Sequence, residues 1–141
     1  MLDHQRINEL LNLVRANLAE LERAQKYSLE ELESDKLHLE GVKHLLQVSI
    51  EALLDVGAHF ISHLKLPTPH SYREIIEILV TAGYLPRERE QRYVEMARFR
   101  NRIVHFYDVI DPQTLYAILH NELDDLRILA ADLLQITERL S

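Results

Sequence analysis

The sequence predicts an all-α protein, built as an antiparallel bundle of about five helices. Apolar residues recur with a period near 3.6 almost from end to end, which is the spacing of one helix face. The sequence shows no alternating strand pattern that competes with this periodicity. It contains only three glycines and four prolines, and this low content disfavours a β-sandwich or a dinucleotide-binding fold. The 141 residues match the length of one domain, so we expect a single helical domain over residues 1–141.

Two long helices are expected in the first half of the chain. The first follows Asp3, a suitable N-cap, and carries an apolar stripe over residues 7–21. The second opens at Ser28 with a capping-box pattern and is expected to run to about Leu64, before Pro67 stops it.

The second helix contains two glycines. Gly41 could mark a bend, and Gly57 costs about 1 kcal/mol relative to alanine in a helix interior. Close packing against another helix or a dimer contact would explain Gly57, and so would an ordinary tolerated defect.

Three further helices are expected in the second half. A capping-box pattern at Ser71 starts a short third helix, and Pro86 suits the first turn of a fourth. The pair Asp111-Pro112 combines an N-cap with a proline at the first helical position, and it begins a fifth helix with an apolar stripe over residues 115–140.

Composition excludes several classes of protein. The chain has no cysteine, which rules out disulfide scaffolds and zinc sites with cysteine ligands. Its longest stretch without Asp, Glu, Lys or Arg is residues 112–121, half of the ~20 apolar residues that a membrane helix needs. The first residues show no apolar run typical of a signal peptide. We therefore expect a cytoplasmic protein without membrane association.

Charge is distributed unevenly along the chain. The net charge of −7 argues against a nucleic-acid partner. Residues 86–105, however, hold six arginines and three glutamates, a local balance of 6 − 3 = +3, against −7 − 3 = −10 for the remainder. This segment is interpreted either as a solvated helix face with Glu–Arg pairs or as a basic surface for a polyanion.

Chemically versatile side chains cluster at the end of this segment. Arg100 carries a planar guanidinium that can hold a phosphate at two points, and His105 offers a neutral imidazole as a base near pH 7. Asn101 lies four residues before His105, on the same helix face, where it could set the orientation and tautomer of the ring. Tyr107 adds a hydroxyl two residues later. A histidine alone is more often a hydrogen-bonded structural residue, so the hypothesis depends on the cluster.

The spacing of Arg100 and His105 does not suit a straight helix. Five residues at about 100° each leave the two side chains about 140° apart. They meet if the helix unwinds near His105, if the long Arg100 side chain closes the gap, or if a second copy supplies one of the two residues across a twofold axis.

The pattern Arg100-(four residues)-His105-Phe106-Tyr107 resembles the R-x-x-x-x-H-x-Y motif of the HEPN superfamily. With an asparagine directly after the arginine, the chain is most similar to the HepT-like toxins, which pair with MNT-type minimal nucleotidyltransferases as antitoxins. Length and helical pattern agree with that family over nearly the whole chain.

The resemblance implies a metal-independent endoribonuclease toxin that acts as a homodimer without a cofactor. It implies that Arg100 and His105 are catalytic, with Asn101 in support, and that the partner enzyme silences the toxin by attaching AMP to Tyr107. The substrate would be an RNA such as a tRNA or an mRNA, because DNA lacks the attacking 2′-hydroxyl.

Two flanking arginines have an open role in this scheme. Arg98 and Arg102 are neighbours on one helix face and could contact RNA phosphates. They could equally form surface ion pairs of little consequence.

Polar residues also recur every four positions on the second helix, including Glu51, Asp55, His59 and His63. They are interpreted as a solvated face, as the wall of a cleft in which Glu51 or Asp55 orients an arginine or histidine, or as a metal site formed by Asp55, His59 and His63. We assign Glu51 and Asp55 as supporting residues and expect no bound metal.

Two other functions remain open at this level. The chain could be a non-catalytic helical module that binds a nucleotide or docks a nucleotidyltransferase, with Arg100 and Tyr107 touching phosphates without chemistry. A weaker alternative is a metal-dependent bundle that uses His59 and His63.

Overall fold

The computed structural model describes residues 2–105 and 110–141, and within these ranges every regular element is helical. The elements are α1 (His4–Ala24), α2 (Leu29–Ser34), α3 (Lys36–His63), α4 (Tyr72–Thr81), a 3₁₀ turn η1 (Arg87–Arg89), α5 (Glu90–Val104), α6 (Pro112–Asn121) and α7 (Leu123–Arg139). The all-α prediction is confirmed for this part of the chain.

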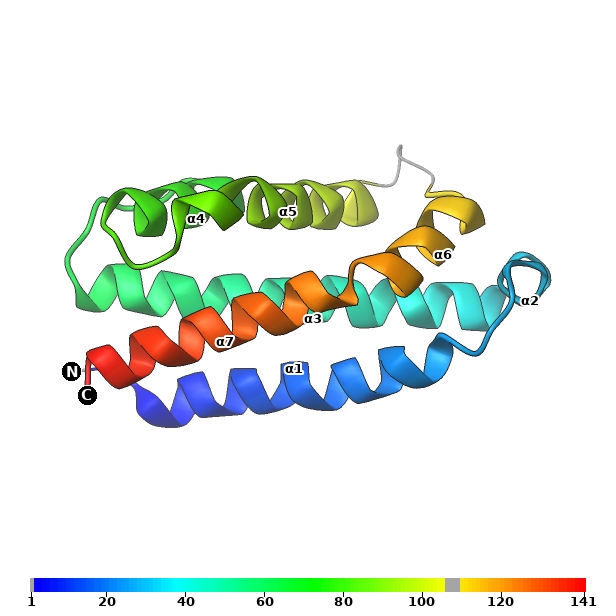
Figure 1. Cartoon of the computed structure of the whole chain (residues 1–141), viewed down its shortest axis with the longest axis horizontal. Helices are drawn as coiled ribbons and strands as arrows, with labels where there is room; N and C mark the ends of the chain where they lie inside the picture. Colours follow the sequence, from blue (N-terminus) through cyan, green and yellow to red (C-terminus); the bar gives the residue numbers. More distant parts are fainter. Residues whose placement is uncertain (1, 106–109) are drawn as a thin grey trace.

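The long helices α1, α3, α5 and α7 alternate in direction along the bundle (Figure 1). Helix α3 lies at the centre and packs against α1, α4, α5 and α7. The buried apolar side chains of all these helices form one contiguous cluster. Both chain ends lie at the same end of the bundle (Figure 1).

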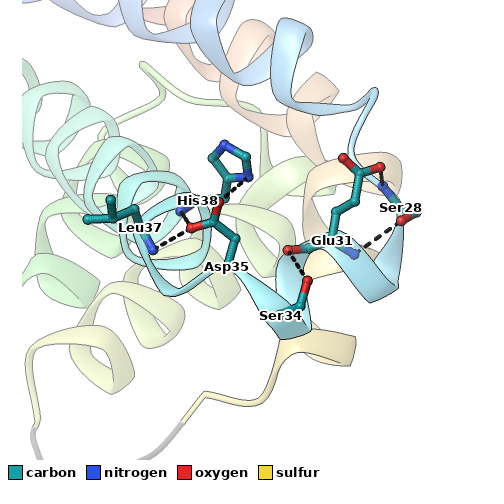
Figure 2. Close-up of polar contacts among 6 residues, drawn as sticks. All are labelled: Ser28, Glu31, Ser34, Asp35, Leu37 and His38. Atoms are coloured by element: carbon teal, nitrogen blue, oxygen red, sulfur yellow. Dashed lines mark hydrogen bonds and ion pairs between the residues drawn. The ribbon is translucent and has the colours of Figure 1, made fainter.

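The described residues contain seven α-helices where the sequence predicts five, because two predicted helices are each divided. The first division lies at Asp35, whose extended backbone (φ −120°, ψ 99°) separates α2 from α3. Its carboxylate accepts hydrogen bonds from the backbone N–H groups of Leu37 and His38, at 3.0 and 3.3 Å. Asp35 is thus the N-cap of a new helix, and Figure 2 shows its contacts.

The predicted capping box at Ser28 is confirmed. Its hydroxyl accepts from the backbone N–H of Glu31 at 3.1 Å, and the Glu31 carboxylate accepts from the backbone N–H of Ser28 at 3.2 Å (Figure 2). The helix that it opens has only six residues. A capping box fixes where a helix starts, and the competing cap at Asp35 decides where this one ends.

The second division lies at Glu122, between α6 and α7. Both helices continue the same apolar stripe and pack against α1 and α3, but α6 also contacts α2, whereas α7 also contacts α5. The change of direction at Glu122 (φ −123°, ψ 5°) lets one stripe cover both surfaces. Periodicity alone could not show this break, because the buried positions keep their spacing across it.

Gly57 lies where α3 and α4 approach each other closely. A Cβ atom at this position would stand 2.8 Å from Cγ2 of Ile75 and 3.2 Å from Cδ1 of Leu79. Close helix packing therefore accounts for this glycine. At Gly41 a Cβ atom would meet nothing within 4 Å, and α3 continues through both positions.

One helix in the described residues, α3, is long and apolar enough by composition to cross a membrane. Its most apolar window is 56% buried inside the bundle. The central helix of a helical bundle passes the same test of length and composition.

Candidate active site

Arg100 lies on α5 and reaches across to α3. Its Nε group donates a hydrogen bond to a carboxylate oxygen of Glu51 at 2.8 Å, and its Nη2 group forms an ion pair with the same oxygen at 2.6 Å. Its Nη1 group donates to the side-chain oxygen of Asn101 at 3.2 Å. The side chain of Arg100 is 24% exposed and that of Glu51 is 23% exposed, so the pair lies at the protein surface with one side covered.

This arrangement leaves part of the guanidinium available. An arginine has five N–H donors, and contacts to described residues use one each on Nε, Nη1 and Nη2 of Arg100. One N–H on each of the two Nη atoms remains. Two parallel donors of this kind match two oxygens of a phosphate.

Tyr72, the first residue of α4, supports the guanidinium from its flat side. The Cζ atom of Arg100 lies 4.7 Å from the centre of the Tyr72 ring, a cation–π contact. The carboxylate of Asp55 on α3 lies close enough to Tyr72 for its charge to raise the pKa of the Tyr72 hydroxyl. Three helices therefore converge on Arg100: α3 through Glu51, α4 through Tyr72 and α5 itself.

Asp55 has an altered acidity. Burial raises the pKa of its carboxyl group, and the negative charge of Glu51, one helical turn away, raises it further. His59 and the hydroxyl of Tyr72 act in the opposite direction without cancelling the shift. The pKa of Tyr72 is also raised, by burial first and by the charge of Asp55 second, so its hydroxyl stays protonated at neutral pH.

These side chains border an open cleft of about 560 Å³. Its wall combines α3, α5 and the segment that leads into α4, with Asp55, Ala58, Pro69, His70, Ser71, Tyr72, Ile75, Arg100 and Asn101. The volume lies within the usual range of pockets for small molecules and nucleotides. The cleft thus places an arginine with unused donors beside a space that can hold a ligand.

His105 lies at the opposite end of the motif. Helix α5 ends at Val104, and His105 is its C-cap, with an extended backbone (φ −83°, ψ 109°) and an N–H that still bonds to the carbonyl of Asn101 at 3.1 Å. The side chain is exposed. Among the described residues none forms a hydrogen bond or ion pair with its ring, and the cleft around Arg100 does not include it. The helix therefore does unwind at His105, while Asn101 contacts Arg100 through its side chain.

A family model described as Ribonuclease HepT-like matches residues 14–133, which include the whole of the cleft wall and both Arg100 and His105. The chain belongs to the HepT-like family. A curated relative, the tRNA nuclease HepT of Aphanizomenon flos-aquae (strain 2012/KM1/D3), is 28% identical over 110 residues, which cover 78% of this chain and 75% of that protein.

Solved structures agree with this assignment at the level of the fold. The tri-AMPylated HEPN toxin of Shewanella oneidensis, solved in complex with an MNT antitoxin, superposes with a TM-score of 0.83 at 18% identity, covering 96% of this chain and 99% of that one. YutE from Bacillus subtilis, described as a cytosolic protein of unknown function, gives a TM-score of 0.83 at 19% identity, covering 98% of this chain and 92% of that one. The fold is thus the HEPN fold.

The other predicted site residues of this HepT-like chain divide into two groups. Arg98 and Arg102 are exposed on the last turns of α5, and Arg98 pairs with Glu95 at 3.0 Å. Arg102 forms no ion pair with any residue in the described ranges. Tyr107 lies outside the described residues.

The excess positive charge of residues 86–105 is matched by acids on other helices. Arg89 pairs with Asp132 at 2.7 Å, Arg92 with Asp125 at 3.8 Å, and Arg100 with Glu51. The three negative charges of these carboxylates balance the local excess of +3. The segment therefore carries a basic surface chiefly at its C-terminal end, where Arg102 lies.

The polar stripe on the HepT-like α3 serves different purposes along its length. Glu51 and Asp55 face Arg100 and Tyr72, whereas His59 is half-buried and His63 is exposed. In the described part of the chain, no group of three His, Asp or Glu side chains is arranged to hold a metal ion. Glu51 and Asp55 thus lie as expected for the wall of a cleft, whereas His63 lies as expected for a solvated helix face.

Sequence reasoning did not identify Tyr72 and His70 as parts of this cleft. Tyr72 attracted notice only as part of the capping box at Ser71, and its distance of 28 residues from Arg100 gives no periodic signal. An aromatic residue at the start of a helix is ordinarily assigned to the core. Only the packing of α4 against α5 brings its ring under the guanidinium.

Proposed function

We propose that this HepT-like protein is a metal-independent endoribonuclease toxin in which Arg100 holds the scissile phosphate and His105 acts as the general base. The proposal depends chiefly on the contacts of the Arg100 guanidinium. It is fixed by Glu51 on one edge and by Tyr72 on one face, and contacts within residues 2–105 and 110–141 leave two of its N–H donors beside an open cleft. The curated relative named as a tRNA nuclease supports the same activity.

The reaction begins with the 2′-hydroxyl of the substrate. His105 removes its proton, and the resulting oxygen attacks the adjacent phosphorus. Arg100 stabilises the negative charge that develops on the phosphoryl oxygens. The bond to the 5′-oxygen breaks, and that oxygen takes up a proton from water. The products are a 2′,3′-cyclic phosphate and a 5′-hydroxyl, and no metal ion is needed.

Two protomers would complete the site. His105 is exposed at the end of α5, outside the cleft that Arg100 borders. A twofold arrangement that brings the ends of two α5 helices together would place His105 of one protomer near the Arg100 cleft of the other. The same arrangement would bring both copies of Arg98 and Arg102 to one surface, where they contact the phosphates of the RNA.

The remaining predicted residues have supporting roles in this scheme. Glu51 orients Arg100, and Asp55 borders the cleft beside Tyr72. The side-chain oxygen of Asn101 accepts from Nη1 of Arg100, and its backbone carbonyl accepts from the backbone N–H of His105. We infer that the substrate is a tRNA, after the relative's name, and that the protein acts in the cytoplasm.

Regulation would occur at Tyr107, two residues after the base. Attachment of AMP to its hydroxyl would add bulk and a negative phosphate next to the basic surface, and would repel RNA. The Shewanella oneidensis toxin is described as tri-AMPylated and in complex with an MNT antitoxin. We therefore infer an MNT-type nucleotidyltransferase as the partner that silences this protein.

The first test is cleavage of total tRNA by purified protein in EDTA. We expect cleavage by the wild type, a loss of about 10²–10⁴-fold in rate for His105→Ala and of about 10²–10³-fold for Arg100→Ala. His63→Ala is the matched control, because His63 is exposed on α3 and has no role in the scheme.

Survival of the RNA with unmodified wild-type protein would contradict the proposal, and so would full activity of His105→Ala. Tight nucleotide binding without cleavage would select the non-catalytic module. Cleavage that stops in EDTA and in His63→Ala would select the metal-dependent alternative.

A further inference from the structure

Arg100 is held on its Nε edge by a single oxygen atom of Glu51 and at Nη1 by the side-chain oxygen of Asn101. Two acceptors at the edges fix where the guanidinium lies, but its plane can still tilt about the line that joins them. Two-point binding of a phosphate needs the plane to be fixed as well, because both remaining N–H bonds must point at their oxygens together. A flat surface against the guanidinium supplies this constraint, and the Tyr72 ring lies 4.7 Å from Cζ.

The Tyr72 ring is held in place through its backbone. Its backbone begins α4, where the Ser71 hydroxyl caps the helix by accepting from the N–H of Glu74 at 3.1 Å. Asp55, on the central helix α3, borders the same cleft. The side chain is only partly exposed, and it borders the cleft that would receive the substrate.

We propose that Tyr72 is a positioning residue whose ring holds the plane of the Arg100 guanidinium for two-point binding of the scissile phosphate. This inference rests on the proposed ribonuclease function and adds a residue that the R-x-x-x-x-H-x-Y motif does not contain. Tyr72 does not touch the reacting atoms. It acts by preorganising the clamp, so its loss reduces the rate of the chemical step more than it weakens binding of the RNA.

Kinetics of three variants test the proposal on the full-length protein with tRNA as substrate. Tyr72→Leu removes the ring face, and we expect kcat to fall about tenfold while KM changes less than about twofold. Tyr72→Phe keeps the ring and loses only the hydroxyl, and we expect kcat within about threefold of the wild type. Tyr84→Leu is the matched control, because Tyr84 stacks under Arg139 at 4.4 Å, beyond the other end of α4.

A spectroscopic measurement separates positioning from a general loss of stability. The ¹⁵N–¹H signal of the Arg100 Nε group can be assigned by its absence in Arg100→Ala. The ring current of Tyr72 shifts this signal, so we expect the shift to persist in Tyr72→Phe and Tyr84→Leu and to disappear in Tyr72→Leu. A merely structural role of Tyr72 would lower the melting temperature without moving this signal selectively.

The outcomes distinguish this inference from the function on which it rests. Wild-type kcat in Tyr72→Leu, with Arg100→Ala inactive, would overturn the role of Tyr72 and leave the ribonuclease proposal intact. An unchanged Arg100 signal in Tyr72→Leu would do the same. If the wild-type protein fails to cleave RNA, the ribonuclease proposal fails and the role of Tyr72 fails with it, whatever the spectrum shows.

Discussion

Glu51 and Asp55 lie one turn apart on α3, yet their carboxylates have different surroundings. The carboxylate of Glu51 is paired with the guanidinium of Arg100 through a hydrogen bond and an ion-pair contact. Among the described residues Asp55 forms no ion pair, and the attractions of His59 and Tyr72 to its charge do not cancel the effect of burial. Burial and the charge of Glu51 therefore raise the pKa of Asp55, which means that its ionised form is less favourable in the folded protein than in the unfolded chain.

The raised pKa of Asp55 predicts a pH dependence of stability. Below the ordinary value of 3.8 the carboxyl is protonated in both states and carries no penalty, and the penalty develops as pH rises through the higher folded value. Asp55→Asn removes the ionisable group and keeps the size of the side chain. We expect this variant to gain free energy of unfolding over the wild type at pH 7, and the gain to vanish below about pH 4.

Urea unfolding at pH 7 and at pH 3.5 measures this difference. Glu40→Gln, at an exposed position on the same helix, is the control for a charge change outside the cleft. A constant difference between the wild type and Asp55→Asn at both pH values would contradict the assignment of the effect to Asp55.

Apolar packing on one side and polar contacts on the other bring the helices to the cleft. Gly57 lets α4 approach α3, and Tyr72 begins α4, so the same approach delivers the ring to Arg100. On the opposite side, Tyr93 and Arg89 both donate to Asp132, which ties the start of α5 to α7. The orientation of the clamp thus depends on the spacing between helices.

Two glycine substitutions on α3 test the role of this packing. Gly57→Ala would place Cβ 2.8 Å from Cγ2 of Ile75, a methyl on a branched and stiff side chain. We expect a loss of about 1–3 kcal/mol in the free energy of unfolding, in spite of the better helix propensity of alanine. Gly41→Ala meets open space and should stabilise the protein by about 0.5–1 kcal/mol.

Chemical denaturation measures the free energy of unfolding of both variants and of the wild type, and equal m-values make these free energies comparable. The opposite signs make the two substitutions controls for each other. A stabilising Gly57→Ala would show that α4 can move away from α3 at little cost.

At the scale of the whole molecule, the two residues that the motif pairs, Arg100 and His105, have different surroundings within one chain. Arg100 borders the cleft, and His105 is exposed beyond the last turn of α5. An assembly of two copies is the arrangement that would bring them to one phosphate. In this proposed dimer, each active site would combine residues of two protomers.

Mixed dimers test this arrangement directly. In a dimer of one Arg100→Ala chain and one His105→Ala chain, residues shared between protomers leave one of two sites intact. We expect the purified mixed dimer, isolated through two different tags, to regain about half of the wild-type activity. The two parent homodimers are the controls and should be inactive.

A mixed dimer as inactive as its parents would show that both residues act within one protomer. A chain that sediments as a monomer at assay concentration, with full activity, would contradict the composite site altogether.

Much of the fold was readable from local patterns. The caps at Asp3, Ser28, Ser71 and Asp111 lie where the sequence predicts helix starts. The divisions at Asp35 and Glu122 were missed, since the apolar stripe keeps its spacing across both. The site residues show the same limit, because only those with a motif or a periodic pattern could be identified from the sequence. The motif pointed to Arg100 and Asn101, and the stripe on α3 pointed to Glu51 and Asp55, whereas Tyr72 carried no signal of its own.

The amino-acid sequence by itself determined the helical class, the faces that are buried and the motif by which the family is recognised. These properties depend on residues three to five positions apart, so short-range chemistry is sufficient to specify them. The tertiary structure alone decided which groups surround Arg100. Its carboxylate partner lies 49 residues away in the chain, and contacts over such separations exist only once the helices have packed. Close approach at Gly57 and the central place of α3 then set the shape of the cleft.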